Sequence, residues 1–158
     1  MTSPRHERGV LDTSTVIMLS RLADAALLPD EPVITAVTLA ELSVGPLVAA
    51  NDAERAARQA HLQQAEADFD PLPFDAQAAR AFGRVAASLR RSGRKTSARA
   101  YDAMIAATAL ANGLPVYTCN PADFAGIDGL EVVPVPVPDP SIASGEPAAA
   151  KRRPRKRS

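Results

Sequence analysis

Cysteine, histidine and tryptophan are scarce or absent in this chain of 158 residues. The single cysteine, Cys119, excludes an intramolecular disulfide and fits a protein of the reducing cytoplasm. With only two histidines, His6 and His61, a zinc site of the Cys/His type cannot be assembled. These absences exclude a disulfide scaffold and a zinc module.

Long apolar runs are also missing. The most apolar early segment, residues 16–28, is interrupted by Arg21 and Asp24, and it is too short and too polar to span a bilayer. The first residues lack the apolar stretch of a signal peptide. The sequence therefore predicts a cytoplasmic protein without membrane contact. Apolar residues still make up 46% of the chain, which is enough for one sizeable core.

The formal net charge is zero, but the charge is unevenly distributed. Six of the 18 basic residues lie in the last eight positions, where no acidic residue occurs, so residues 1–150 carry 12 basic and 18 acidic side chains. Carboxylates that lie close together raise one another's pKa values unless a cation intervenes. An acidic body of this kind would be stabilised by a divalent ion.

The end of the chain differs in composition from the rest. From Pro134 onwards proline alternates with valine, and a Ser/Gly/Ala stretch and the basic tail follow. This composition is typical of a linker. We expect a folded domain over residues 1–135 and a disordered Pro-rich linker and basic tail over 136–158. The tail either binds nucleic acid non-specifically or stays solvated; its sequence allows both.

Strand and helix patterns alternate along residues 9–134. Short apolar strands are expected at 9–11, 32–35, 114–118 and 130–134, the last at a sheet edge because it contains Pro134. Helices are expected at 15–26, 36–45, 52–68, 75–91 and 98–112. This alternation predicts an α/β fold with a mainly parallel sheet covered on both faces, and in such sheets ligands bind at the carboxyl ends of the strands.

Three acidic residues stand in settings that favour a metal site. Asp12 follows the first strand, Glu41 lies in a nearly all-apolar helix, and Asp102 lies in an apolar stretch of the last helix. Mg²⁺ prefers carboxylate and water oxygens, and an Mg²⁺-dependent phosphodiesterase needs several carboxylates from separate elements in one pocket. A buried carboxylate such as Glu41 is costly unless it is paired or bound.

Structural roles remain open for each of these positions. Asp12 would also cap a helix, and either Glu41 or Asp102 would also pair with Arg99. Asn120 and Asp123 are ordinary turn residues as well as candidate ligands.

Four motifs in this order resemble the PIN-domain family, and most of all the VapC-like toxins of type II toxin–antitoxin pairs. The motifs are Val10-Leu-Asp-Thr-Ser14, Thr35-Ala-Val-Thr-Leu-Ala-Glu-Leu42, Tyr101-Asp-Ala-Met-Ile-Ala-Ala-Thr-Ala109 and Thr118-Cys-Asn-Pro-Ala-Asp-Phe124. The resemblance covers residues 9–135. It implies a three-layer α/β/α sandwich and an Mg²⁺-dependent endoribonuclease, with Mn²⁺ as a possible substitute.

The resemblance also implies roles for individual residues. Asp12, Glu41 and Asp102 would be catalytic metal ligands. The fourth ligand would be Asp123 or Asn120. Asp123 would also be a catalytic acid, and Asn120 occupies a place that is Asp in some members. Supporting hydroxyls would come from Thr13, Ser14 and Thr118.

Partners follow from the same resemblance and from charge. A basic loop separates the helices expected at 75–91 and 98–112. In and beside this loop, four basic residues could bind RNA phosphates: Arg91, Arg94, Lys95 and Arg99. VapC-like proteins are typically homodimers, each neutralised by a VapB-like antitoxin whose C-terminal segment covers the acid pocket. A segment that supplies Arg or Lys to the carboxylates would block access of the metal.

Two other functions compete with the endoribonuclease. Asp12-Thr-Ser-Thr after a strand is similar to the start of haloacid-dehalogenase-type phosphatases, but these need a second Asp where this chain has Ser14. A non-catalytic PIN-like module that binds RNA or a partner is the other alternative, and it predicts binding without metal-dependent cleavage.

Overall fold

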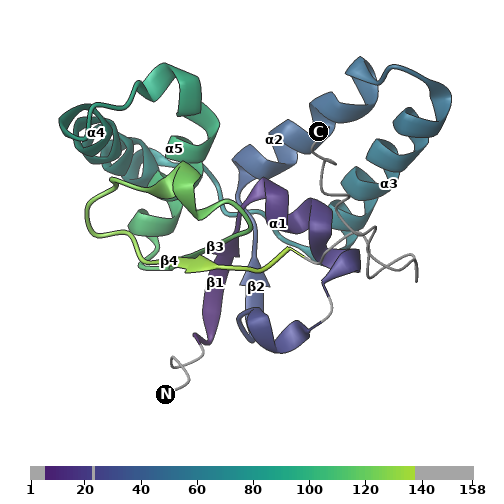
Figure 1. Cartoon of the computed structure of the whole chain (residues 1–158), viewed down its shortest axis with the longest axis horizontal. Coiled ribbons are helices and arrows are strands. Elements are labelled where there is room, and N and C mark those ends of the chain that lie inside the picture. Colours follow the sequence, from purple (N-terminus) through teal and green to yellow (C-terminus); the bar gives the residue numbers. More distant parts are fainter. Residues whose placement is uncertain (1–5, 23, 138–158) are drawn as a thin grey trace, which may run out of the picture.

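The computed structural model describes residues 6–22 and 24–137, and Figure 1 shows their arrangement. Four parallel strands form the sheet in the order β2-β1-β3-β4: β1 (Arg8–Leu11), β2 (Glu31–Val33), β3 (Val116–Thr118) and β4 (Val132–Pro134). The two edge strands contain Pro32 and Pro134, which have no backbone N–H to donate to a neighbour. The expected edge strand near Pro134 is confirmed. Positions 138–158 of the expected tail lie outside the described residues.

Within the described residues, five α-helices connect and cover these strands. They are α1 (Thr13–Met18), α2 (Ala36–Val44), α3 (Asp52–Asp68), α4 (Ala76–Arg91) and α5 (Ala100–Ala111). Short 3₁₀ turns are η1 (Leu19–Arg21), η2 (Ala25–Leu27), η3 (Gly45–Val48), η4 (Thr96–Arg99) and η5 (Pro121–Phe124). Asp75 caps α4 by accepting from the Ala78 N–H at 2.9 Å, as its position predicts.

The expected helix over residues 15–26 is wrong in its second half. Helix α1 ends at Met18 and is followed by η1 and η2. Asp24 accepts a hydrogen bond from the Ala26 N–H at 2.8 Å, which caps the second turn instead of continuing the first helix. The chain has to reverse here because β2 begins at Glu31 and pairs in parallel with β1.

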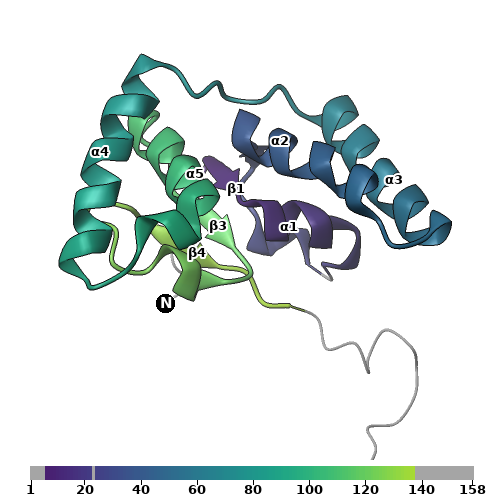
Figure 2. The same ribbon diagram turned by 90° about the horizontal axis from the view of Figure 1, so that it is seen from above.

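Alternate residues of the central strands point into two separate cores. Val10 and Val116 lie in a core formed with α4 and α5, whereas Leu11 and Tyr117 lie in a core formed with α1 and α3. Figure 2 shows α4 and α5 on one side of the strands and α1 and α3 on the other. This is the three-layer α/β/α arrangement that the sequence predicts.

In Figure 1, β1 and β2 run upwards, and α1 and α2 follow their carboxyl ends. Gly113 follows α5 at φ +65°, a conformation that favours glycine at a helix end. Within the described ranges, no helix has both the length and the hydropathy that crossing a bilayer requires.

Candidate active site

Asp12 is buried and held by a set of hydroxyl groups at the end of β1. It is the N-cap of α1 and accepts from the Thr15 N–H at 3.1 Å. Its carboxylate also accepts from the hydroxyls of Thr15 and Thr118, both at 2.7 Å, and from Ser14 at 2.9 Å. These donors fix the orientation of both carboxylate oxygens. Asp12 is therefore a helix cap, and as a metal ligand it would exchange one of these donors for the ion, because an ionised carboxylate has about four lone-pair sites.

Glu41 lies half-buried on α2 and faces α1. The Thr13 hydroxyl donates to Glu41 Oε1 at 2.8 Å. Burial raises the pKa of the Glu41 carboxyl, the Thr13 hydrogen bond lowers it, and the negative charge of Asp12 raises it. The residue is thus stabilised by a neutral donor, and the expected alternative of an ion pair with Arg99 does not occur.

Asp102 lies in the first turn of α5 and is surrounded by like charge. Burial is the largest cause that raises its pKa to about 6; repulsion from Asp123, Glu41 and Asp12 adds to it, and Arg99 partly opposes it. Within residues 6–22 and 24–137, no side chain donates a hydrogen bond to Asp102. Three carboxylates from separate elements therefore act on Asp102 at the carboxyl end of the sheet.

The two candidates for the fourth position differ in their surroundings. Asp123, in η5, accepts from Arg99 Nη1 at 2.6 Å. Asn120 is exposed, and its backbone N–H donates to the Thr118 hydroxyl at 2.9 Å. Asp123 thus adds charge near Asp102, whereas the Asn120 backbone orients a hydroxyl that contacts Asp12.

The expected RNA-binding cations are mostly bonded to the protein. Arg91 pairs with Asp128, Arg94 Nη1 donates to the Ala122 carbonyl at 2.7 Å, and Arg99 pairs with Asp123. These three contacts join the end of α4, the loop after it and η4 to the segment that follows β3. Lys95 is exposed and forms no ion pair in the part of the chain that the structure describes.

Two residues of the site were not among the predicted site residues. Thr15 is fully buried and contacts both Asp12 and the Cys119 backbone N–H, the latter at 3.2 Å. Thr38 lies 3.1 Å from the Thr13 hydroxyl. Their spacing was the available signal: Thr15 is three residues after the cap, and Thr38 is one helical turn before Glu41.

The donor set fits a divalent cation in its chemistry. Asp12, Glu41 and Asp102 offer hard oxygens, and the like charge around Asp102 is what a bound cation would relieve. Among the described residues, no three Asp, Glu, His or Cys side chains are already grouped closely enough to form a metal site. The three carboxylates that would bind an ion come from separate elements: Asp12 caps α1, Glu41 lies on α2 and Asp102 lies on α5.

Comparison with known proteins places this arrangement in a family. Residues 10–130 match the PIN domain. Ribonuclease VapC5 of Mycobacterium tuberculosis is 46% identical over 129 residues, which are 80% of this chain and 93% of that protein. Ribonuclease VapC of Rickettsia bellii is 29% identical over 133 residues, which are 82% of this chain and 98% of that protein.

Solved structures agree with the sequence matches. The crystal structure of VapBC-5 from Mycobacterium tuberculosis, a member of the VapBC family of toxin–antitoxin systems, superposes with a TM-score of 0.72 at 45% identity. The match covers 82% of this chain and 99% of that one. The chain therefore belongs to the PIN-domain family and, within it, to the VapC group.

Proposed function

We propose that this protein is a divalent-metal-dependent endoribonuclease that acts as the toxin of a VapBC-type toxin–antitoxin pair. The observation that carries the proposal is that Asp123, Glu41 and Asp12, from separate elements at the carboxyl end of the sheet, all lie close enough to Asp102 to raise its pKa. The ribonuclease names of the relatives support it. Because the proposed substrate is cellular RNA, we also propose a cytoplasmic location.

Asp12, Glu41 and Asp102 would hold the metal, Mg²⁺ or Mn²⁺. When bound, such an ion supplies charge stabilisation at the phosphate and an activated water for hydrolysis of the phosphodiester bond. The chain's own contribution is to prepare the ligands. Ser14, Thr15 and Thr118 fix the orientation of Asp12.

The protonation of the ligands sets the working pH. The Thr13 hydrogen bond favours the ionised form of Glu41 against its burial. Asp102, with a pKa of about 6, is largely ionised only above that pH. We therefore expect cleavage to rise with pH through this range, because a carboxylate binds a metal only when ionised.

We propose Asp123 as the fourth acid. Its charge acts on Asp102, and the amide of Asn120 carries none. Asp123→Asn should therefore impair cleavage more than Asn120→Ala. Equal effects of the two substitutions, or a larger effect of Asn120→Ala, would contradict this choice.

Cleavage of RNA by the purified protein tests the proposed function. We expect cleavage with Mg²⁺ that stops with a chelator, and its loss in Asp12→Asn and Asp102→Asn, while Glu66→Gln, on the exposed surface of α3, cleaves like the wild type. New RNA 5′ ends and growth arrest should follow induced expression in a bacterium. RNA binding without cleavage would favour a non-catalytic module, and hydrolysis of an aryl phosphate without RNA cleavage would favour a phosphatase.

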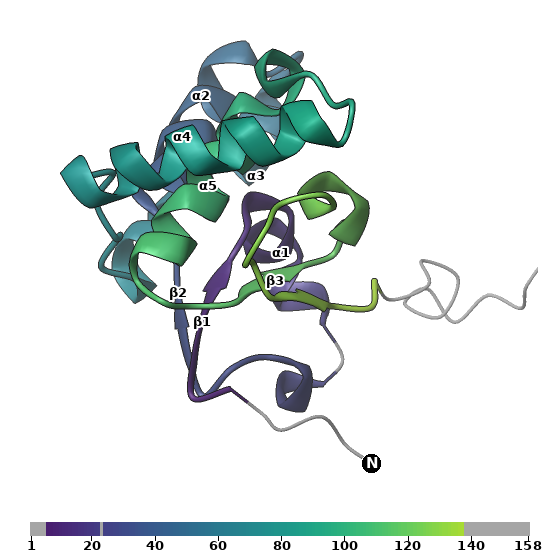
Figure 3. The same cartoon turned by 90° about the vertical axis from the view of Figure 1, so that its left-hand side faces the viewer.

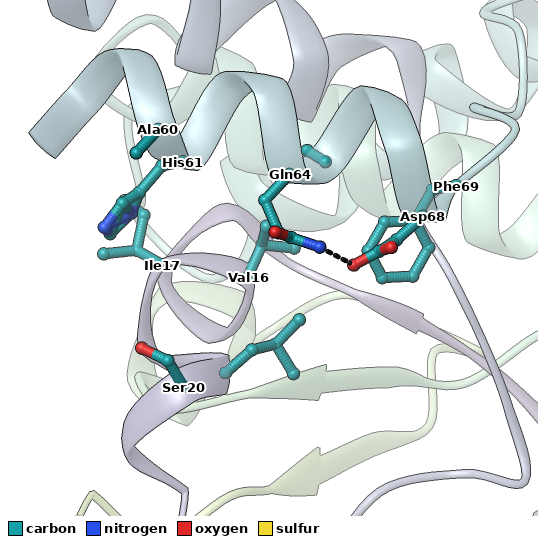
Figure 4. A pocket seen from close by; sticks show the side chains of 10 residues that line it. Val16, Ile17, Ser20, Ala60, His61, Gln64, Asp68 and Phe69 are labelled. Carbon is teal, nitrogen blue, oxygen red and sulfur yellow. Dashed lines mark hydrogen bonds between the residues drawn. The ribbon is translucent and has the colours of Figure 1, made fainter. Parts of the chain in front are cut away.

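We also propose that a cognate VapB-like antitoxin inhibits the site from the groove between α1 and α3. Val16 and Ile17 face His61 and Phe69 across one part of this groove (Figure 4). An adjoining cavity of about 500 Å³ shares Ile17 and His61 and reaches Glu41. An amphipathic segment lying here would bring a basic side chain to the carboxylates. Co-expression of the neighbouring upstream gene should restore growth, and Ile17→Glu should prevent that rescue.

Homodimerisation is a separate proposal. Val44, Leu47 and Val48 form an exposed apolar patch at the end of α2, and Leu47 is 84% exposed. Contiguous exposed apolar surface often marks an interface. Light scattering after size-exclusion chromatography should give a dimer for the wild type and a monomer for Leu47→Glu. A monomeric wild type would contradict the proposal.

A further inference from the structure

The outer face of α4 is strongly basic. Residues 80–99 contain seven Lys and Arg side chains and no Asp or Glu. Arg80, Arg84 and Arg91 are spaced by four and seven residues, which places them on one face of the helix. All three are exposed, and Figure 3 shows α4 in front of α5 on this side of the molecule.

A cleft of about 480 Å³ lies beside this face. It is lined by Arg84, Ser88 and Arg91 of α4, by Leu110 of α5, and by Asp128 and Gly129. The Ser88 hydroxyl is buried and accepts a hydrogen bond from the Asp128 N–H at 3.3 Å. This bond holds the loop around Asp128 against α4. The cleft thus has a polar contact at Ser88, two arginines on its α4 side and the Asp128 carboxylate, which pairs with Arg91, on the other.

The cations of this face are more available than those nearest the acids. Arg94 and Arg99 donate to Ala122 and Asp123. Within the described ranges, by contrast, Arg80 and Arg84 form no ion pair or side-chain hydrogen bond. Arg91 contacts Asp128 through Nη2 and keeps its other guanidinium donors. An anion in the cleft would therefore meet the unpaired guanidinium of Arg84 and the remaining donors of Arg91.

The position of the cleft defines the kind of ligand. Leu110 lies eight residues after Asp102 on the same helix, a separation of about 12 Å along the helix axis. A ligand that reaches both the acid site and the cleft must be an extended polyanion. We propose that Arg80, Arg84 and Arg91 form a distal subsite for backbone phosphates of the RNA substrate. This inference rests on the proposed function.

Such a subsite contributes through charge. Phosphates neutralised by Arg release counterions, so the affinity for single-stranded nucleic acid falls with salt in proportion to the number of contacts, with a logarithmic slope of about 0.7 per phosphate. The subsite should matter for a long RNA that spans both places and not for a short oligonucleotide confined to the acids.

Binding measured in an Asp12→Asn background, which prevents cleavage, tests the subsite. Fluorescence anisotropy would compare a short and a long single-stranded RNA over a salt series. Adding Arg80→Gln and Arg84→Gln should weaken binding of the long RNA by about tenfold at low salt and reduce the slope by about 1.4, which corresponds to two phosphate contacts. Binding of the short RNA should change less than twofold. The matched control, Arg8→Gln with Arg55→Gln, removes the same charge elsewhere and should change neither.

Three results would overturn the subsite: unchanged binding of the long RNA, an equal loss in the control variant, or an equal loss for the short RNA. Thermal unfolding midpoints of the two double variants check that both remain folded. The proposed function is judged separately, because it fails if the protein with Asp12 intact does not cleave RNA, whatever the binding series gives.

Discussion

The two halves of the molecule that flank the acid site use charge in opposite ways. On the α3 side, Arg55 and Arg58 pair with acids three and four residues earlier in the same helix. On the α4 side, the arginines either reach a segment far along the chain, as Arg99 reaches Asp123, or have no acid near them in sequence. Charge on α3 is thus balanced locally. Charge on α4 is balanced only by the tertiary fold and in part remains for a polyanion.

The same contrast applies to the two half-buried site acids. Glu41, on α2, is held by the neutral hydroxyl of Thr13. Asp102, on α5, is influenced by the positive charge of Arg99 and accepts no hydrogen bond from the described residues. Burial is the largest cause of the raised pKa in both acids; beyond it, Glu41 is stabilised by a short-range donor, whereas Asp102 is affected by the charges of neighbouring residues. Substitutions in each half should separate these two controls.

Among the substitutions that separate these two controls, the largest effect is expected for Thr13→Val. Thr13→Val removes the donor to Glu41, so the pKa of Glu41 should rise further and the carboxylate should lose its fixed orientation. Loss of a supporting partner of a metal ligand typically costs about 10- to 100-fold. We expect kcat/KM for RNA cleavage to fall by that amount. Ser43→Ala, on the exposed side of α2, is the control, and a Thr13→Val enzyme within twofold of the wild type would remove Thr13 from the site.

Arg99→Gln tests electrostatic control on the other side. Arg99 lowers the pKa of Asp102, so its loss should raise that pKa and require a higher pH for ionisation. Because Arg99 makes the smallest of the contributions to this pKa, the rate of RNA cleavage should fall about twofold at pH 6 and stay nearly unchanged at pH 8. Arg94→Gln, whose guanidinium binds a backbone carbonyl, should lower the rate equally at both pH values or leave it unchanged. A pH-independent loss in Arg99→Gln would mean that the residue acts by another route.

A moderate effect on stability is expected for Asp102→Asn without metal. The folded-state pKa of Asp102 is about 6, above the usual 3.8, so its ionisation opposes folding. This cost is absent below about pH 4, grows between pH 4 and 6, and is complete above that range. The full shift corresponds to about 3 kcal/mol, which solvent screening at a half-buried group reduces to about 1–2 kcal/mol.

Urea unfolding in the presence of a chelator measures this difference. Asp102→Asn should be more stable than the wild type at pH 8 and equal to it at pH 3.5. A wild type that is as stable as the variant at pH 8 would show that the four carboxylates do not repel one another as the fold implies.

The smallest effect is expected on α3. Arg55 and Asp52 form an exposed pair of spacing i,i+3, and such pairs contribute little to stability. Arg55→Gln should shift the thermal midpoint by less than about 2 °C and leave RNA cleavage unchanged. A larger loss would show that this half of the molecule also depends on individual ion pairs.

Much of the fold follows from the sequence because its signals are local. The apolar run before Asp12, the cap at Asp75 and the edge proline Pro134 each predict their element correctly. The expected helix over 15–26 fails because its apolar spacing continues past the point where the chain must turn back towards β2. That constraint comes from strand pairing, which no local pattern contains.

The candidate site divides in the same way. The sequence by itself determined which acids are candidates: Asp12 after a strand, and Glu41 and Asp102 in apolar helices. A carboxylate in an apolar helix is costly unless it is paired or bound. The tertiary structure alone decided their surroundings. It placed the Thr13 hydroxyl beside Glu41 and Arg99 beside Asp123, and it raised the pKa of Asp102 by burying it and by bringing three other carboxylates near it. The physical reason is that side-chain preferences act over a few residues, whereas electrostatic partners are chosen by proximity in space.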